Sequence, residues 1–298
     1  MITVMGATGK TGGSIARRLL DAGQPVRALG RSERGLAALK SLGAETMAGD
    51  ASDVAFLTDA FRGAGSIYTL SPYDPATPDY HVTQTRMGEA IIGAIHAAGV
   101  RRVVFLSSVG ADLPAGTGFI ASLHAQEQRL RQLTGVDVLV LRCGSFFENF
   151  LASLDLIRTA GINGDTVAPD VPIPMIATQD IAEVAARSLT TRDWSGFTVR
   201  ELLGERDLSY AEATRIIGER IGQPDLPYVR FPDDELAAAL RAAGFADDSV
   251  RGQLELNRAL SDGTVVSREG RTPANTTPTR FEDYATELAA AFATVGIQ

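Results

Sequence analysis

The sequence of 298 residues predicts an α/β protein, with a doubly wound parallel sheet followed by a smaller C-terminal α+β lobe. Three observations support this prediction. Short apolar runs alternate with helix-length amphipathic segments through the first half, a glycine-rich turn follows the first run, and the pattern loosens after Asn149. Strands separated by helices pair in parallel, and a parallel sheet is covered by helices on both faces.

The apolar runs predict six strands in the first half of the chain. They cover residues 2–5, 26–29, 45–48, 66–70, 102–106 and 136–141, with amphipathic helices between them, for example at 14–22 and 87–98. Because a glycine-rich turn follows the first strand, we expect residues 1–150 to form a dinucleotide-binding domain. Residues 151–298 should mainly form a substrate lobe, with a segment near 175–200 returning to the first domain.

The second half shows weaker but definable elements. The stretch at 165–174 is proline-rich and extended, and "TQDIAEVAARSL" predicts a helix with Asp180 as its N-cap. Ser209 and Glu212 form a capping-box pattern at the start of another helix. A further helix is expected at 233–246, then a polar stretch at 261–279 and a terminal helix at 281–292.

The composition limits the partners of the chain. A net charge of −8 makes nucleic acid and anionic membrane surfaces poor partners. The one cysteine, Cys143, excludes an internal disulfide, and histidines without companions at ligand spacing make a metal site unexpected. We expect a cytoplasmic protein without a signal peptide or membrane span, and its oligomeric state stays open.

The segment "MGATGKTGG" places Gly6, Gly9 and Gly12 between the first strand and the first helix. Such a turn aims backbone N–H groups and the positive end of a helix at one point, where glycines let a pyrophosphate approach. Dinucleotide binding is therefore expected, and a tight packing turn is the alternative. The candidate cofactor contacts in this segment are Gly6, Thr8, Gly9, Lys10, Thr11 and Gly12.

The second strand is followed by Arg31, in "VRALGRSE". At this place an acidic residue usually binds a free ribose 2′-hydroxyl, whereas an arginine accommodates a 2′-phosphate. Arg31, with Lys10 in reach, therefore favours NADP(H) over NAD(H). Asp50, in "AGDASD" after the third strand, is a candidate for the adenine amine, or together with Asp53 a cap of the next helix.

With these features, "RRVVFLSSVGAD" and "LRCGSFFENF", the chain resembles the NmrA-like family of atypical short-chain dehydrogenases. "TQDIAEVAARSL" and "LSYAEATRIIGERIG" extend the resemblance nearly end to end. The resemblance implies a Rossmann domain that binds NADP(H), with a smaller lobe that closes a cleft over the nicotinamide. The family contains quinone and azo reductases, and also redox sensors that bind the cofactor without turnover.

The chain departs from the usual short-chain dehydrogenases in its proton donor. Those enzymes pair a tyrosine with a lysine four residues later, but here the only lysines are Lys10 and Lys40, and neither follows a tyrosine at that spacing. Where catalytic relatives often carry a lysine, "SLHAQEQRLRQLTG" offers His124. Cys143 stands where a proline is common in the family.

His124 and Tyr73 are the candidate catalytic residues. A histidine is suited to donate a proton near neutral pH. The alternative is that His124 forms a hydrogen bond with the cofactor amide or with the backbone. Tyr73, in "LSPYDP", should border the cleft and bind substrate, or only pack its loop. The candidates for the nicotinamide side are Ser71, Ser107, Ser108 and Phe146.

Two functions follow from these features. The first is an NADPH-dependent oxidoreductase that transfers hydride to a small, electron-poor acceptor such as a quinone. Hydride addition to such an acceptor gives a stabilised anion, so the missing lysine is tolerable. The alternative is a non-catalytic NADP(H)-binding redox sensor.

Overall fold

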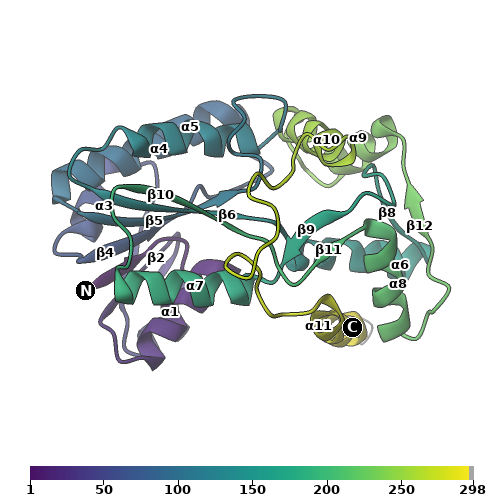
Figure 1. Ribbon diagram of the computed structural model, residues 1–298, viewed down its shortest axis with the longest axis horizontal. Coiled ribbons are helices and arrows are strands. Elements are labelled where there is room, and N and C mark those ends of the chain that lie inside the picture. The colour runs from purple at the N-terminus through teal and green to yellow at the C-terminus, as the bar shows by residue number, and fades with distance from the viewer. Residues whose placement is uncertain (295–298) are drawn as a thin grey trace.

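The computed structural model describes residues 1–294 and contains a parallel sheet of seven strands (Figure 1). The strand order is β10-β6-β5-β4-β1-β2-β3. Its strands are β1 (Ile2–Val4), β2 (Val26–Gly30), β3 (Glu45–Ala48), β4 (Ser66–Thr69), β5 (Arg102–Ser108), β6 (Asp137–Cys143) and β10 (Phe197–Leu202). The six predicted strands are confirmed, each within two residues, because buried parallel strands are continuous apolar runs.

Helices cover both faces of the sheet, as the doubly wound prediction requires. One face carries α1 (Lys10–Asp21), α2 (Glu33–Ser41) and α7 (Thr178–Thr191), and the other carries α3 (Val54–Phe61), α4 (Tyr80–Ala98) and α5 (Ile120–Arg131). Both α7 and β10 come from the second half of the chain, and β10 pairs in parallel with β6.

The remaining elements build a second hydrophobic core beside the carboxyl ends of the strands (Figure 1). They are β7 (Ser145–Phe146), a 3₁₀ helix (Phe147–Ser153), α6 (Leu154–Ala160), β8 (Asn163–Asp165), β9 (Ile173–Ile176), β11 (Asp207–Leu208), α8 (Tyr210–Arg220), β12 (Tyr228–Arg230), α9 (Asp233–Ala242), α10 (Asp247–Ser261) and α11 (Phe281–Thr294). Residues 295–298 of the expected lobe lie outside the described residues.

Helix α10 is the main element that the sequence pattern did not predict. The expected helix at 233–246 ends at Ala242, because Gly244 turns the chain with a φ of 87°, and α10 begins at Asp247. The buried face of α10 includes Ser249, Gly252 and Asn257. Since these small and polar residues interrupt the apolar Val250, Ala259 and Leu260 on the same face, its apolar periodicity is hard to see in the sequence.

The predicted role of Asp180 as an N-cap is wrong. Helix α7 begins at Thr178, whose backbone N–H and hydroxyl donate to the carboxylate of Glu148. The buried Asp180 carboxylate instead accepts the backbone N–H and the hydroxyl of Thr279, at 3.0 and 2.6 Å. Ser209 does cap α8 through the Glu212 N–H, but the Glu212 carboxylate pairs with Arg206 and does not complete the predicted capping box.

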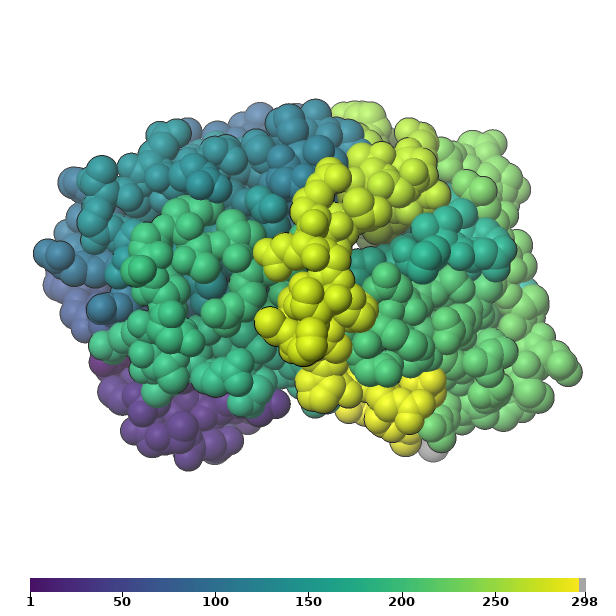
Figure 2. Space-filling model, in the orientation of Figure 1, coloured from purple at the N-terminus to yellow at the C-terminus, as the bar shows by residue number. Residues whose placement is uncertain are grey.

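Residues 262–280 form a strap that runs from α10 to α11 between the sheet and the second core (Figure 2). Glu201 of β10, which is buried, accepts the backbone N–H groups of Arg268 and Glu269. The Arg268 guanidinium pairs with Asp112 at 2.7 Å, and Thr279 binds Asp180. The strap therefore fixes the second core against the carboxyl ends of the strands.

We expect the substitution Asp180→Ala to lower the free energy of unfolding by about 1–2 kcal/mol, because it removes both acceptors of the half-buried Thr279 N–H and hydroxyl. Glu183 lies on the same helix and makes an exposed ion pair with Arg18, so Glu183→Ala should cost less than about 0.5 kcal/mol. Denaturant unfolding of both variants measures the difference. Equal stabilities would show that Asp180 does not hold the strap.

Candidate cofactor and substrate site

Different structural features account for glycine at the three positions of the loop. Gly6 has a φ of 63°, which favours glycine, and a Cβ on Gly12 would lie 2.4 Å from the carbonyl oxygen of Gly6. Gly9 has a φ of −91° and a ψ of 175°, which any residue adopts, and a Cβ there would meet only the Gly6 oxygen, at 3.3 Å. The conformation therefore does not require glycine at position 9, and packing constrains it only through this one tight contact, whereas a ligand approaching the loop would explain it more fully.

The loop delivers the N-terminus of α1 to the carboxyl edge of the sheet. Gly9 is its N-cap, and within residues 1–294 no side chain caps the helix and no acidic residue stands in its first turn. Thr8 and Lys10 are exposed at this end, and Thr11 is buried. The first-turn N–H groups and the positive end of the helix dipole thus form the kind of arrangement to which anions such as a pyrophosphate bind.

Arg31 and Asp50 follow the neighbouring strands β2 and β3 at the same edge. The Arg31 side chain is 85% exposed and contacts only Asp74 as an ion-pair partner among the described residues, at 3.6 Å. The Asp50 carboxylate accepts the backbone N–H and the hydroxyl of Ser52, and these bonds lower the pKa of Asp50. Asp53 caps α3. Asp50 thus caps a local turn while remaining exposed beside the expected adenine position.

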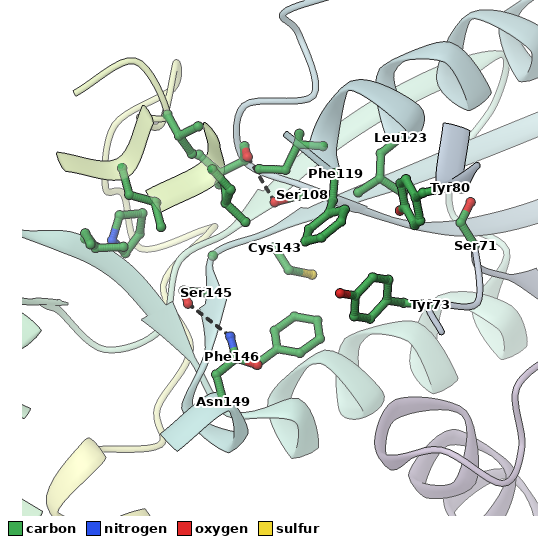
Figure 3. Close-up of a pocket in the computed structure, with 18 residues that line it drawn as sticks. Ser71, Tyr73, Tyr80, Ser108, Phe119, Leu123, Cys143, Ser145, Phe146 and Asn149 are labelled. Carbon is green, nitrogen blue, oxygen red and sulfur yellow. Dashed lines mark hydrogen bonds between the residues drawn. The ribbon is translucent and has the colours of Figure 1, made fainter. Parts of the chain in front are cut away.

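A cavity of about 280 Å³ opens beyond the ends of β4, β5 and β6, against the second core (Figure 3). Its walls come from both parts of the molecule and carry no charged side chain within residues 1–294. The lining residues are Ser71, Tyr73, Tyr80, Ser108, Val109, Phe119, Ile120, Leu123, Cys143, Gly144, Ser145, Phe146, Asn149, Ile173, Pro174, Leu256, Leu260 and Val265.

Four of the predicted site residues line this cavity: Ser71, Tyr73, Ser108 and Phe146. Ser107 lies next to it but is buried, and its hydroxyl donates to Glu127 at 2.6 Å. Glu127 is fully buried and pairs with Arg142 at 2.6 Å, so the Ser107 hydroxyl is engaged in a bond that joins β5, α5 and β6.

His124 does not line the cavity. It lies in the second turn of α5, and its Nδ1 is 2.9 Å from the carbonyl oxygen of Ala111. A neutral or protonated ring donates to that oxygen from Nδ1, which leaves Nε2 as the other polar atom. The structure therefore places His124 in the backbone-binding position that was the alternative to its role as a proton donor.

Tyr73, Tyr80 and Phe119 form an aromatic cluster on one wall, with ring centroids 4.8–5.8 Å apart. Figure 3 shows the hydroxyl of Tyr73 directed into the cavity, on the side where Cys143 and Phe146 lie. Partial burial raises the pKa of Tyr73, and burial also raises the pKa of the Cys143 thiol. The phenol and the thiol are therefore both neutral at physiological pH.

Most of the cavity wall carries no pattern that predicts it from the sequence. Leu256 and Leu260 lie on the unpredicted helix α10, and Val265 comes from the strap. Phe119 and Tyr80 stand at the starts of α5 and α4, in segments that gave no catalytic pattern. No local signal would have identified these residues, since only the packing of the second core brings them to the strand ends.

In the described part of the chain, no group of three or more histidine, cysteine, aspartate or glutamate side chains is placed to hold a metal ion. None of the helices in residues 1–294 is both long and apolar enough to cross a membrane.

The fold and this site define a Rossmann-type α/β protein, with a dinucleotide-type glycine loop and a neighbouring small-molecule cavity. The model of the NmrA-like family matches residues 1–264, and the chain belongs to this family. The resemblance of its sequence motifs is thus confirmed.

The chain is similar to two reductases over nearly their full length. A (4-alkanoyl-5-oxo-2,5-dihydrofuran-3-yl)methyl phosphate reductase of Streptomyces griseus is 31% identical, with 98% of this chain and 99% of the relative aligned. An NAD(P)H azoreductase of Xenophilus azovorans is 28% identical, with 98% and 99% covered.

Solved structures share the fold at lower identity. An NADPH-dependent quinone oxidoreductase of Escherichia coli, complexed with NADPH, has a TM-score of 0.80 and 23% identity, over 97% of this chain and 99% of that one. A triphenylmethane reductase of Citrobacter sp. has a TM-score of 0.77 and 20% identity, over 97% and 99%.

Proposed function

We propose that the protein is an NADPH-dependent reductase that transfers hydride to a small, uncharged, electron-poor ring such as a quinone. One observation carries this proposal: the glycine loop and the uncharged aromatic cavity share the carboxyl edge of one parallel sheet. In open α/β sheets, ligands bind at this edge. Membership of the NmrA-like family supports this reaction class. So does the similarity of the chain to two reductases, whose names give azo compounds and a phosphate ester as their substrates.

The residues at this edge fit a bound NADP(H). The open space at Gly9 and the first turn of α1 suit the pyrophosphate, with Gly6, Thr8, Thr11 and Gly12 shaping the turn. Arg31 and Lys10 would hold the 2′-phosphate, and Asp50 would accept from the adenine amine. Ser71, Ser108 and Phe146 would contact the nicotinamide end, with Ser107 supporting them. When bound, NADPH supplies the hydride from its nicotinamide ring.

The cavity selects the acceptor by polarity. A charged acceptor would lose hydration on entering a wall of aromatic and aliphatic side chains, and no opposite charge on the wall would compensate for that loss. A flat, neutral ring is instead stabilised by the aromatic cluster of Tyr73, Tyr80 and Phe119. We therefore expect a different acceptor preference from that of the phosphate ester reductase, despite the 31% identity.

Reduction of the acceptor requires a proton in addition to the hydride. Hydride and one proton together convert a quinone to a hydroquinone. Tyr73 would donate that proton, because its hydroxyl points into the cavity (Figure 3). His124 would then support the cavity wall through Ala111.

The test is NADPH oxidation, followed by its absorbance, with a panel of neutral quinones and sulfonated analogues of matched reduction potential. We expect turnover with the neutral compounds and little with the sulfonates. Tight NADPH binding with no turnover on any compound would overturn the reductase and favour the non-catalytic sensor.

The cofactor preference is tested by Arg31→Asp. We expect it to weaken NADPH binding by about 1.5–3 kcal/mol, the size of a charge-assisted hydrogen bond, and to improve the relative affinity for NADH. Calorimetry with both cofactors measures the change. Unchanged NADPH affinity would show that Arg31 does not contact the 2′-phosphate.

We also infer a cytoplasmic location, where NADPH is available and the single thiol stays reduced. The acidic charge makes nucleic acid an unexpected partner.

A further inference from the structure

The ion pair between Arg31 and Asp74 spans the glycine loop. Arg31 follows β2, Asp74 belongs to the loop after β4, and β1 lies between these two strands in the sheet. The Arg31 Nη1 and the Asp74 Oδ2 are 3.6 Å apart. The pair therefore joins the two sides of the edge to which β1 delivers the glycine loop.

The Asp74 carboxylate is held in place by its own loop. Its Oδ1 accepts the backbone N–H of Ala76 at 3.1 Å, which leaves Oδ2 facing Arg31. The Gln84 side chain of α4 donates to the carbonyl oxygen of Pro72 at 2.7 Å. The backbone N–H of Ala246, at the start of α10, donates to the carbonyl oxygen of Pro75 at 2.9 Å.

The same loop forms part of the cavity. Tyr73 precedes Asp74 and lines the cavity, and α10, which binds Pro75, contributes Leu256 and Leu260 to it. The contact with Arg31 thus connects the expected 2′-phosphate position to the wall of the substrate cavity.

We propose that Asp74 is a residue that determines cofactor specificity, by competing with the 2′-phosphate of NADP(H) for Arg31. The inference rests on the proposed function. In the free protein Asp74 neutralises Arg31, and a 2′-phosphate must replace it. An NAD(H) molecule carries a hydroxyl there and leaves the pair intact. Asp74 therefore lowers the affinity for the phosphorylated cofactor and keeps its release possible.

The test uses two nucleotides that differ only in the group at issue, adenosine 2′,5′-bisphosphate and AMP, titrated calorimetrically against the full chain. We expect Asp74→Asn to bind the bisphosphate about three- to fivefold more tightly, the scale of an exposed ion pair, with AMP unchanged within about twofold. NADPH and NADH should show the same difference.

Asp79→Asn is the matched control. Asp79 ends the same loop, its φ of 51° suits asparagine, and its side chain caps nothing in the described helix α4. This variant removes an equal charge and should change neither affinity. In an Arg31→Gln background, Asp74→Asn should lose most of its effect.

Three results would overturn the proposal: an unchanged bisphosphate affinity in Asp74→Asn, an equal gain for AMP, or the same gain when Arg31 is replaced. If the wild-type chain bound both nucleotides equally, the NADP(H) preference itself would fail, and Asp74 would have no phosphate to compete with. Wild-type selectivity with an inert Asp74 would reject this inference alone.

Discussion

Gly9→Val is expected to abolish measurable NADPH binding, a loss of about a thousandfold or more, while the protein stays folded. The Gly9 backbone lies in the extended region that a β-branched residue adopts readily, and its missing Cβ faces open space apart from the Gly6 oxygen. The added branches would occupy the space through which a pyrophosphate approaches the N–H groups of α1. Fluorescence or calorimetric titration measures the binding, and circular dichroism checks the fold.

Gly12→Ala provides the contrast. Its Cβ would lie 2.4 Å from the Gly6 oxygen and 2.7 Å from the Met5 oxygen, so α1 must shift and the protein should lose stability even without a ligand. Comparison of the two variants distinguishes a glycine needed for ligand binding, Gly9, from a glycine needed for packing, Gly12. NADPH affinity near that of the wild type in Gly9→Val would reduce the loop to a packing turn.

The second large effect is expected from Tyr73→Phe, which should lower kcat with a quinone about a hundredfold at unchanged NADPH affinity. General acid catalysis contributes at least this much, and the lower end of its range applies because hydride addition to a quinone gives a stabilised anion. Phenylalanine keeps the aromatic contacts with Tyr80 and Phe119 and removes only the hydroxyl. Single-turnover absorbance at saturating NADPH measures the step.

The pH profile distinguishes the two candidate donors. Because burial raises the pKa of Tyr73, its phenol stays protonated from about pH 6 to 9. Turnover should therefore be nearly flat over this range. A histidine donor would lose its proton as the pH rises through about 6–8. His124→Gln should change turnover less than about threefold, since its Nδ1 binds Ala111 outside the cavity. A large loss in His124→Gln with an intact Tyr73→Phe would reverse this assignment.

The local sequence located six of the seven strands of the sheet, all except β10, and the residues that we propose bind the cofactor. Buried parallel strands are short apolar runs, so the six strands could be located within two residues. Since the carboxyl ends of parallel strands meet at one edge, Gly9, Arg31 and Asp50 could be expected there together. These predictions need only the residues of a strand and of the turn that follows it. The motifs that resemble the NmrA-like family are equally short, so the family could also be identified from the sequence.

Only the tertiary structure decided the substrate half. Leu256 of α10 and Val265 of the strap are 183 and 192 residues after Tyr73 in the chain, and the packing of the second core brings them to one cavity. Small and polar residues on the buried face of α10 concealed that helix, and no residue pattern shows the bond between His124 and Ala111. Strand periodicity is local and can be read from the chain, whereas a cavity wall depends on distant segments meeting, which only the fold specifies.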